Sequence, residues 1–249
     1  MIKKVIFLMT VLGGMLMTAC EEQDIMVFGD EHMVYFEKFW HDSMLGNEKS
    51  DSTQVTFYFN EAANTTQHAE LVVVLAGRKL ERDAHFRLRV VDELTTALPE
   101  DYTLQDEYTF RALPVRDDAL QMQDTIRIQL NRTSHLQSLE DGFRLVLEIV
   151  PSEALGVGQY ERSRAIIYVS KNPVRPEWWN IEVSTYLLGT YSPLKYKLFL
   201  ENVPGARELN KEIIEDSPDW ARKLALDFKK WLIENPTYDE DGSLLDVPV

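Results

Sequence analysis

Alternation of apolar and polar residues between about residue 31 and residue 170 most constrains how this chain can fold. Every second residue of several short segments is apolar there, and polar turns separate the segments. A period of two is typical of half-buried strands, because successive side chains of a strand point to opposite faces of the sheet. The clearest alternating segments are Val55–Phe59, Phe86–Val90, Ile126–Leu130 and Phe143–Ile149.

Two further segments, Leu71–Leu75 and Ala165–Val169, are almost continuously apolar and predict central strands. With Val34–Phe36 they bring the count to about seven strands in roughly 140 residues. This number of strands, each with one apolar face, predicts that residues 31–170 form an antiparallel β-sandwich of immunoglobulin type. A β-barrel is the alternative, because the period of two does not distinguish a barrel from a sandwich.

A linker is expected at residues 171–177, because the two prolines of KNPVRPE cannot donate to a central ladder. Beyond it the apolar period becomes helical, so residues 178–249 are predicted to form an α-helix-rich C-terminal domain. Ser192–Pro193 and Ser217–Pro218 are start signals for two helices, since proline lacks the N–H group that the first turn leaves unpaired. The second predicted helix carries one apolar face and ends at Asn235–Pro236.

Residues 1–19 have the segment order of an export signal. Two lysines precede the uncharged apolar run Val5–Met17, which is shorter than the roughly 20 apolar residues that a membrane span needs. Small residues then lead into Cys20, the only cysteine, and this segment resembles a bacterial lipobox. We therefore expect residues 1–19 to be removed. Cys20 would then carry diacylglycerol and palmitate at the start of an acidic tether, residues 20–30.

The formal net charge of −15 disfavours contact with nucleic-acid phosphates and with anionic lipid headgroups. Membrane contact is expected only through the lipid on Cys20, since two or more acyl chains suffice for stable anchoring. Acylation of Cys20 leaves no thiol for disulfides, redox chemistry or metal ligation. Three of the four residues 21–24 are acidic. They resemble the tag that sorts Bacteroidota lipoproteins to the outer face of the outer membrane.

Short motifs spread over most of the chain after Cys20 resemble a family of Bacteroidota lipoproteins of unassigned function. These motifs are Pro99–Tyr102, Asp124–Leu130, Leu145–Glu148, Pro176–Trp179, Leu188–Tyr196, Asp239–Gly242 and Val247–Val249. The resemblance implies an immunoglobulin-like or Calx-β-like N-terminal domain, and genes nearby for a SusC-like TonB-dependent transporter and a SusD-like lipoprotein. It thus implies an accessory surface lipoprotein of a nutrient uptake system for oligosaccharides or peptides, with these two proteins as partners. It transfers no catalytic residue.

Catalytic signatures are absent from the sequence. The five histidines are scattered without an HExxH spacing, and no GxSxG motif offers a nucleophilic serine. Asp239–Gly242 lacks the spaced acids of a calcium loop. We therefore expect no catalytic residue, no metal site, no cofactor and no enzymatic activity. A hydrolase stays the third hypothesis, because the many carboxylates could still supply a catalytic pair.

Tryptophans are the best candidates for binding a ligand or partner. Trp178 and Trp179 are adjacent where the two predicted domains meet, and exposed aromatic rings there could stack on a sugar or anchor a protein. Burial of both rings at the junction is the alternative. Trp40 lies in a polar loop region and carries the same two alternatives. The second hypothesis is therefore an independent surface lipoprotein that captures a glycan or a peptide.

Overall fold

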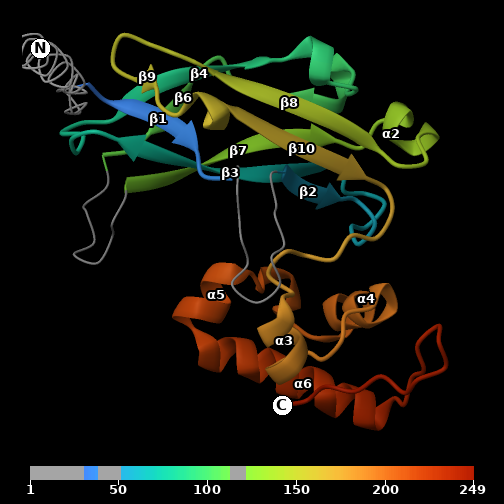
Figure 1. Cartoon of the computed structure of the whole chain (residues 1–249). Helices are drawn as coiled ribbons and strands as arrows, with labels where there is room; N and C mark the ends of the chain where they lie inside the picture. Colours follow the sequence, from blue (N-terminus) through green and yellow to red (C-terminus); the bar gives the residue numbers. More distant parts are fainter. Residues whose placement is uncertain (1–30, 39–51, 113–121) are drawn as a thin grey trace, which may run out of the picture. The chain divides into compact units, whose positions relative to one another are not determined.

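The computed structural model describes residues 31–38, 52–112 and 122–249. Residues His32–Val249 belong to one compact unit. In chain order, strands dominate the first part of this unit and short helices the last part (Figure 1). Ten strands and five α-helices lie in the described ranges.

Each sheet has five strands and contains one parallel pair. The first sheet has the order β5-β7-β3-β1-β9, and the second has the order β2-β10-β8-β4-β6. β1 and β9 run parallel, as do β10 and β2, whereas the other pairings are antiparallel. The strands are β1 Met33–Phe36, β2 Ser52–Thr56, β3 Thr66–Ala76, β4 Ala84–Val90, β5 Tyr102–Thr103, β6 Tyr108–Phe110, β7 Met122–Asn131, β8 Phe143–Val150, β9 Gly156–Val157 and β10 Arg164–Ser170.

Apolar side chains from both sheets meet in one hydrophobic cluster. The alternation predicted from the sequence is present in β7, where Ile126, Ile128 and Leu130 are buried and Arg127 between them is exposed. β8 and β10 lie inside the second sheet and bury apolar side chains with a similar period. Burial of this apolar area, at roughly 25 cal/mol per Å², is the main stabilisation of the two sheets.

The chain after β10 forms α3 to α6. Pro193 and Pro218 are the first residues of α4 and α6, as the start signals predict. At α4 the Ser192 hydroxyl accepts a hydrogen bond from the Lys195 backbone N–H at 3.1 Å, whereas the Ser217 hydroxyl makes no such bond at α6. The helices and 3-10 turns are η2 Asp92–Leu94, η3 Pro99–Asp101, α2 Ser134–Ser138, η4 Tyr160–Arg162, α3 Ile181–Tyr186, α4 Pro193–Asn202, η5 Ala206–Glu208, α5 Lys211–Asp216 and α6 Pro218–Glu234.

The prediction of an antiparallel immunoglobulin-type sandwich was wrong, because both sheets are mixed. Alternation shows which face of a strand is buried, but it does not specify the neighbouring strand or its direction. β2 accordingly pairs in parallel with β10, a long-range pairing that no local pattern encodes. The prediction of a helix-rich C-terminal domain was also wrong, since the helices are short and the described chain is mostly β. The exact domain boundaries, at 31–170, 171–177 and 178–249, stay a prediction.

A buried carboxylate secures the Pro99–Tyr102 motif against α2. Asp101 is fully buried, and its carboxylate accepts hydrogen bonds from the Leu98 backbone N–H and from His135 Nδ1, each at 2.7 Å. The Thr133 hydroxyl donates a third bond. Because a buried carboxylate without partners is costly, these bonds hold η3 beside the end of β7. The motif therefore has a structural role.

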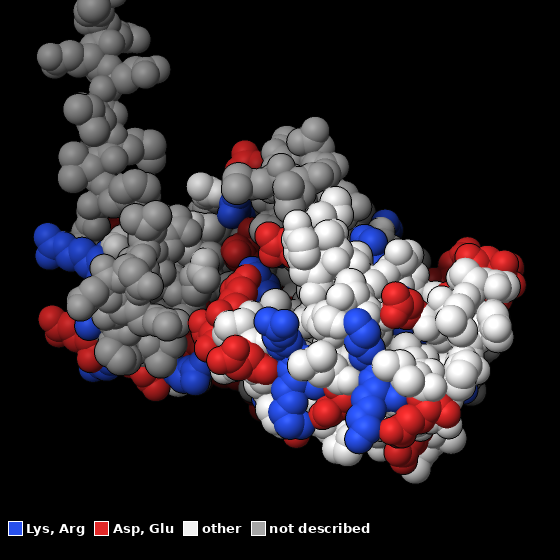
Figure 2. Space-filling view, turned by 90° about the horizontal axis from the view of Figure 1, so that it is seen from below, with Lys and Arg blue, Asp and Glu red and all other residues white. Residues whose placement is uncertain are grey.

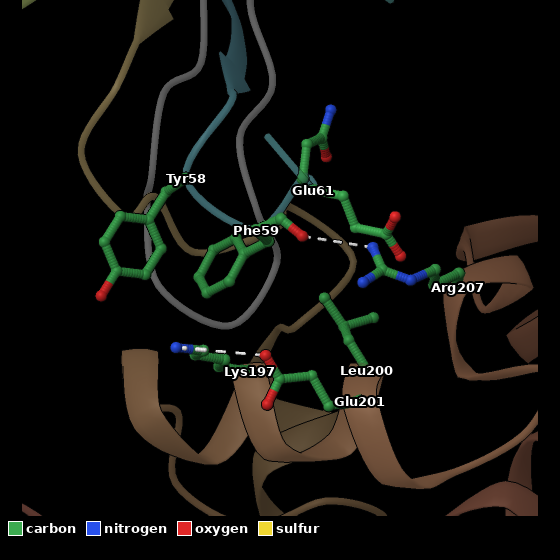
Figure 3. Close-up of a pocket in the computed structure, with 8 residues that line it drawn as sticks. Tyr58, Phe59, Glu61, Lys197, Leu200, Glu201 and Arg207 are labelled. Atoms are coloured by element: carbon green, nitrogen blue, oxygen red, sulfur yellow. Dashed lines mark hydrogen bonds and ion pairs between the residues drawn. The ribbon is translucent and has the colours of Figure 1, made fainter. Parts of the chain in front are cut away.

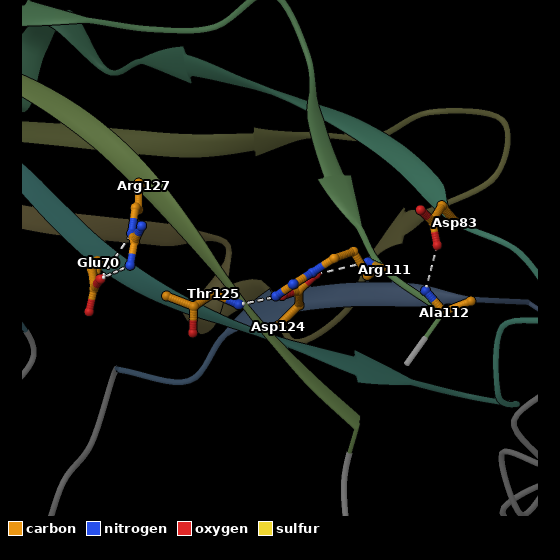
Figure 4. Close-up of polar contacts among 7 residues, drawn as sticks. All are labelled: Glu70, Asp83, Arg111, Ala112, Asp124, Thr125 and Arg127. Carbon is orange, nitrogen blue, oxygen red and sulfur yellow. Dashed lines mark hydrogen bonds and ion pairs between the residues drawn. The ribbon is translucent and has the colours of Figure 1, made fainter. Parts of the chain in front are cut away.

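A second buried carboxylate joins β7 to the chain after β6 (Figure 4). The side chain of Asp124 is 1% exposed. It accepts hydrogen bonds from the backbone N–H groups of Arg111 and Thr125, each at 2.8 Å, and from the Arg111 guanidinium. Burial raises the pKa of Asp124, but these bonds outweigh burial and hold it below the usual 3.8. On the same strand Arg127 pairs with Glu70 at 2.8 Å, where both side chains are exposed.

Arg111→Met should therefore lower the free energy of unfolding by about 1–3 kcal/mol, because it leaves a buried carboxylate with fewer partners. Arg127→Met is the matched control and should lower the free energy of unfolding by only about 0–1 kcal/mol, because exposed ion pairs contribute little to stability. Denaturant titration near pH 7 measures both. Equal losses in the two variants would contradict this account of Asp124.

The same pair predicts a pH dependence. Since the folded-state pKa of Asp124 lies below 3.8, its contribution to stability is complete above that value and is lost as the pH falls through the folded-state pKa. The stability difference between the natural protein and Arg111→Met should therefore shrink in acid. If the difference in unfolding free energy between the two proteins stays constant from pH 7 to pH 2, the titration of Asp124 does not contribute to stability as described.

Candidate functional site

The turn at residues 57–61, which follows β2, is fixed by an arginine at the end of β7. Nη2 of Arg132 donates to the Phe57 carbonyl at 2.8 Å, and Nη1 donates to the Glu61 carbonyl at 3.2 Å. The guanidinium also lies over the Phe57 ring, 5.2 Å from its centroid. Backbone carbonyls in this turn thus receive charged donors, which form stronger hydrogen bonds than neutral ones.

A second arginine holds the same turn from the helical part of the unit. Nη1 of Arg207, in η5, donates to the Phe59 carbonyl at 3.2 Å. The Phe59 ring packs edge-to-face against Tyr196 of α4, with centroids 4.6 Å apart. This geometry is the one that aromatic pairs prefer. The turn is therefore seated on α4 by one polar and one aromatic contact.

These contacts leave a small open cavity, which we call the turn–helix pocket, with a volume of about 210 Å³. Figure 3 shows Tyr58 and Phe59 on the turn side, and Lys197, Leu200 and Glu201 of α4 opposite them. Arg207 closes one end of the pocket. The lining residues are Tyr58, Phe59, Asn60, Glu61, Lys197, Leu200, Glu201 and Arg207.

Charge in the turn–helix pocket is balanced, because two cationic and two anionic side chains line it. Lys197 and Glu201 are one helical turn apart, with Nζ and Oε1 separated by 4.0 Å. Arg207 lines the pocket and donates through Nη1 to the Phe59 carbonyl. The Tyr58 side chain is 46% exposed. The pocket thus offers donors, acceptors and one accessible aromatic ring.

An aromatic cluster lies behind the turn–helix pocket. Tyr196 contacts Trp178 and Trp179 edge-to-face, at centroid distances of 5.9 Å and 5.6 Å. Tyr191 packs against Trp179 at 5.3 Å. Burial is the main cause that raises the pKa of Tyr191 and of Tyr196 to about 12. Both hydroxyls therefore stay neutral near pH 7, and the cluster is an uncharged support.

The predicted binding tryptophans differ in their surroundings. Trp179 is fully buried, and its Nε1 donates to the Gly189 carbonyl at 2.9 Å. Trp178 is partly exposed and stacks on Trp179 at 5.6 Å. A ligand can therefore reach Trp178 but not Trp179 in this conformation. Trp40 and the lipid-attachment residue Cys20 lie outside the described residues.

Sequence reasoning did not find the residues of the turn–helix pocket. Tyr58 and Phe59 belong to an alternating segment that predicted a strand, whereas β2 ends at Thr56. Lys197 and Arg207 carry no local motif. Their proximity to Tyr58 arises only because the turn and α4 pack together, and no pattern along the chain encodes that contact.

A larger cavity, of about 620 Å³, lies between the loop before α4 and the C-terminal segment. Lys195 is buried beside it, and its Nζ donates to the carbonyls of Asp246 at 3.0 Å and Leu188 at 3.4 Å. Burial lowers the pKa of Lys195, although Asp239 and Asp246 act in the opposite direction. The amine thus joins Leu188 to the C-terminal segment at Asp246, which gives Leu188–Tyr196 a structural role.

The described ranges hold neither a metal-binding cluster nor a membrane-spanning helix. No group of three or more histidine, cysteine, aspartate or glutamate side chains among residues 31–38, 52–112 and 122–249 is placed to hold a metal ion. In the same ranges no helix has both the length and the apolar character needed to cross a membrane.

The fold and pocket define a protein with two mixed β-sheets, short C-terminal helices and an open, charge-balanced pocket. Residues 30–204 match the family described as "Domain of unknown function (DUF4843)", and the chain belongs to this family. No curated protein matches the sequence.

Three solved structures from Bacteroides resemble parts of the chain. A protein of unknown function from Bacteroides ovatus is 15% identical over 55% of this chain and 44% of its own, with a TM-score of 0.34. A candidate carbohydrate-binding protein from the same species is 16% identical over 58% and 38%, with a TM-score of 0.34. A two-domain protein of unknown function from Bacteroides fragilis is 10% identical over 57% and 46%, with a TM-score of 0.35. The chain thus spans less than half the length of these proteins.

The contrast between the two adjacent tryptophans gives a stability prediction. Trp179→Phe removes the donor to the Gly189 carbonyl and opens space in a fully buried site, so it should lower the free energy of unfolding by about 2–4 kcal/mol. Trp178→Phe should cost roughly 1 kcal/mol or less, since surface substitutions have small effects. Thermal or denaturant unfolding measures both changes. A larger loss for Trp178→Phe would contradict the assignment of Trp179 as the core residue.

Proposed function

We propose that this chain is a non-enzymatic accessory lipoprotein, anchored through Cys20 on the outer face of an outer membrane. Its partners are a SusC-like TonB-dependent transporter and a SusD-like lipoprotein, which import oligosaccharides or peptides. The order of segments before Cys20, the acidic residues after it and the family resemblance support this proposal. The main task of the folded part is then to contact another protein.

The observation that carries this role is a strip of side chains on the outer face of α6. Arg222, Leu226, Lys230 and Ile233 follow one another at spacings of four, four and three residues, which places them on one side of the helix. Leu226 is 45% exposed and Ile233 is 71% exposed. Exposed apolar residues seven apart on a helix are typical of a helix that inserts into a partner's groove. We call these four residues the α6 strip.

The charge of the α6 strip indicates the chemistry of its partner. Neither Arg222 nor Lys230 forms an ion pair with another residue of the described ranges. Figure 2 shows basic side chains among uncharged and acidic surface on the side of the molecule that is seen from below Figure 1. Cationic side chains without an ion-pair partner in the described ranges suit a partner surface that carries carboxylates.

The proposal predicts that the lipoprotein co-purifies at a fixed ratio with a SusC-like transporter from gently solubilised outer membranes. Arg222→Glu with Lys230→Glu should reduce the recovered transporter by about fivefold or more, because like charges then meet across the interface. Affinity purification with quantitative mass spectrometry measures the ratio.

A charge-matched control is available on the β-sheet part of the unit. Arg82→Glu with Arg87→Glu changes the net charge equally at exposed positions outside the α6 strip, and it should leave the recovery unchanged. Recovery of the natural lipoprotein without a transporter would contradict the accessory role. Equal recovery with the two double variants would contradict the role of the α6 strip.

A second candidate function is capture of a glycan or a peptide by the chain itself. The exposed Tyr58 ring within the turn–helix pocket favours this function. Titration calorimetry of the intact lipoprotein against a panel of oligosaccharides and peptides tests it. We expect a heat of binding for at least one ligand class. The absence of a binding signal for every member of the panel would contradict direct capture.

A further inference from the structure

The size of the turn–helix pocket limits what can enter it. Its volume of about 210 Å³ is below the roughly 300–1,000 Å³ of pockets that enclose a whole drug-sized ligand. The pocket can therefore receive one ring or one side chain of a longer molecule, with the rest of that molecule outside. This favours a chain-like ligand.

The walls of the pocket are mostly polar. Asn60, Glu61, Lys197, Glu201 and Arg207 outnumber the apolar lining residues, whereas typical ligand pockets are mainly apolar with a few polar groups. An apolar side chain in this pocket would remove water from charged groups without replacing its hydrogen bonds, which is costly. A ligand rich in hydroxyl groups replaces those bonds with its own.

Charge balance argues against a charged ligand. A carboxylate would meet Glu61 and Glu201 as well as Lys197 and Arg207, and an amine would meet the same four groups with the signs reversed. Attraction and repulsion would therefore offset each other for either ion, while the cost of removing its hydration would remain. A neutral ligand avoids that cost and can still hydrogen-bond to all four side chains.

One aromatic ring that lines the pocket is accessible to solvent. Tyr58 lies beside Phe59 on the turn side of the pocket (Figure 3). It stands edge-to-face to Phe59 at a centroid distance of 5.0 Å. An exposed ring of this kind offers a flat apolar face to one side of a ligand. The polar residues of the pocket can then hydrogen-bond to groups at the edge of that ligand.

We propose that the turn–helix pocket binds one neutral pyranose ring of a glycan. The Tyr58 ring lies against the C–H face of the sugar, and Glu61, Lys197, Glu201 and Arg207 hydrogen-bond to its hydroxyl groups. This inference rests on the capture function proposed above and names its ligand class. The two arginines that fix the turn, Arg132 and Arg207, prepare the pocket before binding and so reduce the ordering cost.

The test is a titration of the intact lipoprotein in a detergent without a sugar headgroup, so that the detergent cannot compete. The neutral probes are cellotriose, maltotriose and mannotriose; the charged probes are trigalacturonic acid and a glucosamine trimer. At least one neutral trisaccharide should bind more tightly than both charged probes by about fivefold or more, which corresponds to roughly 1 kcal/mol. Titration calorimetry gives the affinities.

Two variants assign the binding to the pocket. Tyr58→Ala should weaken binding of the best neutral probe by about fivefold or more, the effect of losing one aromatic stacking contact. Tyr160→Ala is the matched control, because Tyr160 is a 77% exposed residue outside the pocket. This variant should bind the same probe as tightly as the natural protein does. Circular dichroism melting verifies that both variants fold. In the natural protein, the methyl signals of Leu200 should also shift during the titration.

The outcomes separate this inference from the proposed functions. Preferred binding of a charged trisaccharide would overturn the neutral-ring assignment and leave glycan capture standing. Neutral binding that Tyr58→Ala does not weaken would overturn the pocket assignment and leave capture standing. Binding of peptides alone, or of no probe, would overturn the inference, while the co-purification experiment would still decide the accessory role.

Discussion

The contact between the 57–61 turn and α4 determines both the pocket and the way in which the helices join the sheets. Arg132 and Arg207 donate to carbonyls of this short turn from two different elements. Phe59 places an aromatic ring on Tyr196, and Tyr196 in turn contacts both tryptophans. A short turn has too little apolar area to hold its own conformation, so these donors and this ring pair define it.

This arrangement separates structural from accessible aromatic residues. Trp179 is fully buried and its indole N–H is paired, so its contribution is to the packing of the helices. Tyr58 lies outside the aromatic cluster, is joined to it only through Phe59, and is 46% exposed. The cluster thus supports the turn that carries the accessible ring. The α6 strip lies on a different helix from the pocket residues of α4.

Local patterns predicted local structure well. The alternation in β7 and the Ser–Pro signals before α4 and α6 depend on residues close together in the chain, and the structure confirms these elements. Pairing was not predictable in this way, because β2 lies beside β10 and more than 100 residues separate them. The segment Val55–Phe59 alternates like a strand, yet its second half forms a turn, in which the Arg132 guanidinium donates a hydrogen bond to the Phe57 carbonyl. The pocket was not predictable for the same reason, because it depends on a contact between Phe59 and Tyr196 that only the folded chain makes.

The most direct test of this account is a nuclear Overhauser measurement between the ring protons of Phe59 and Tyr196 in the intact, isotope-labelled protein. Their centroids lie 4.6 Å apart, so strong cross-peaks are predicted in the absence of any ligand. Phe199 and Phe228, at 5.3 Å within the helical cluster, provide the internal control. Cross-peaks for the control pair without any for Phe59 and Tyr196 would contradict the claim that the turn is seated on α4 and forms the pocket.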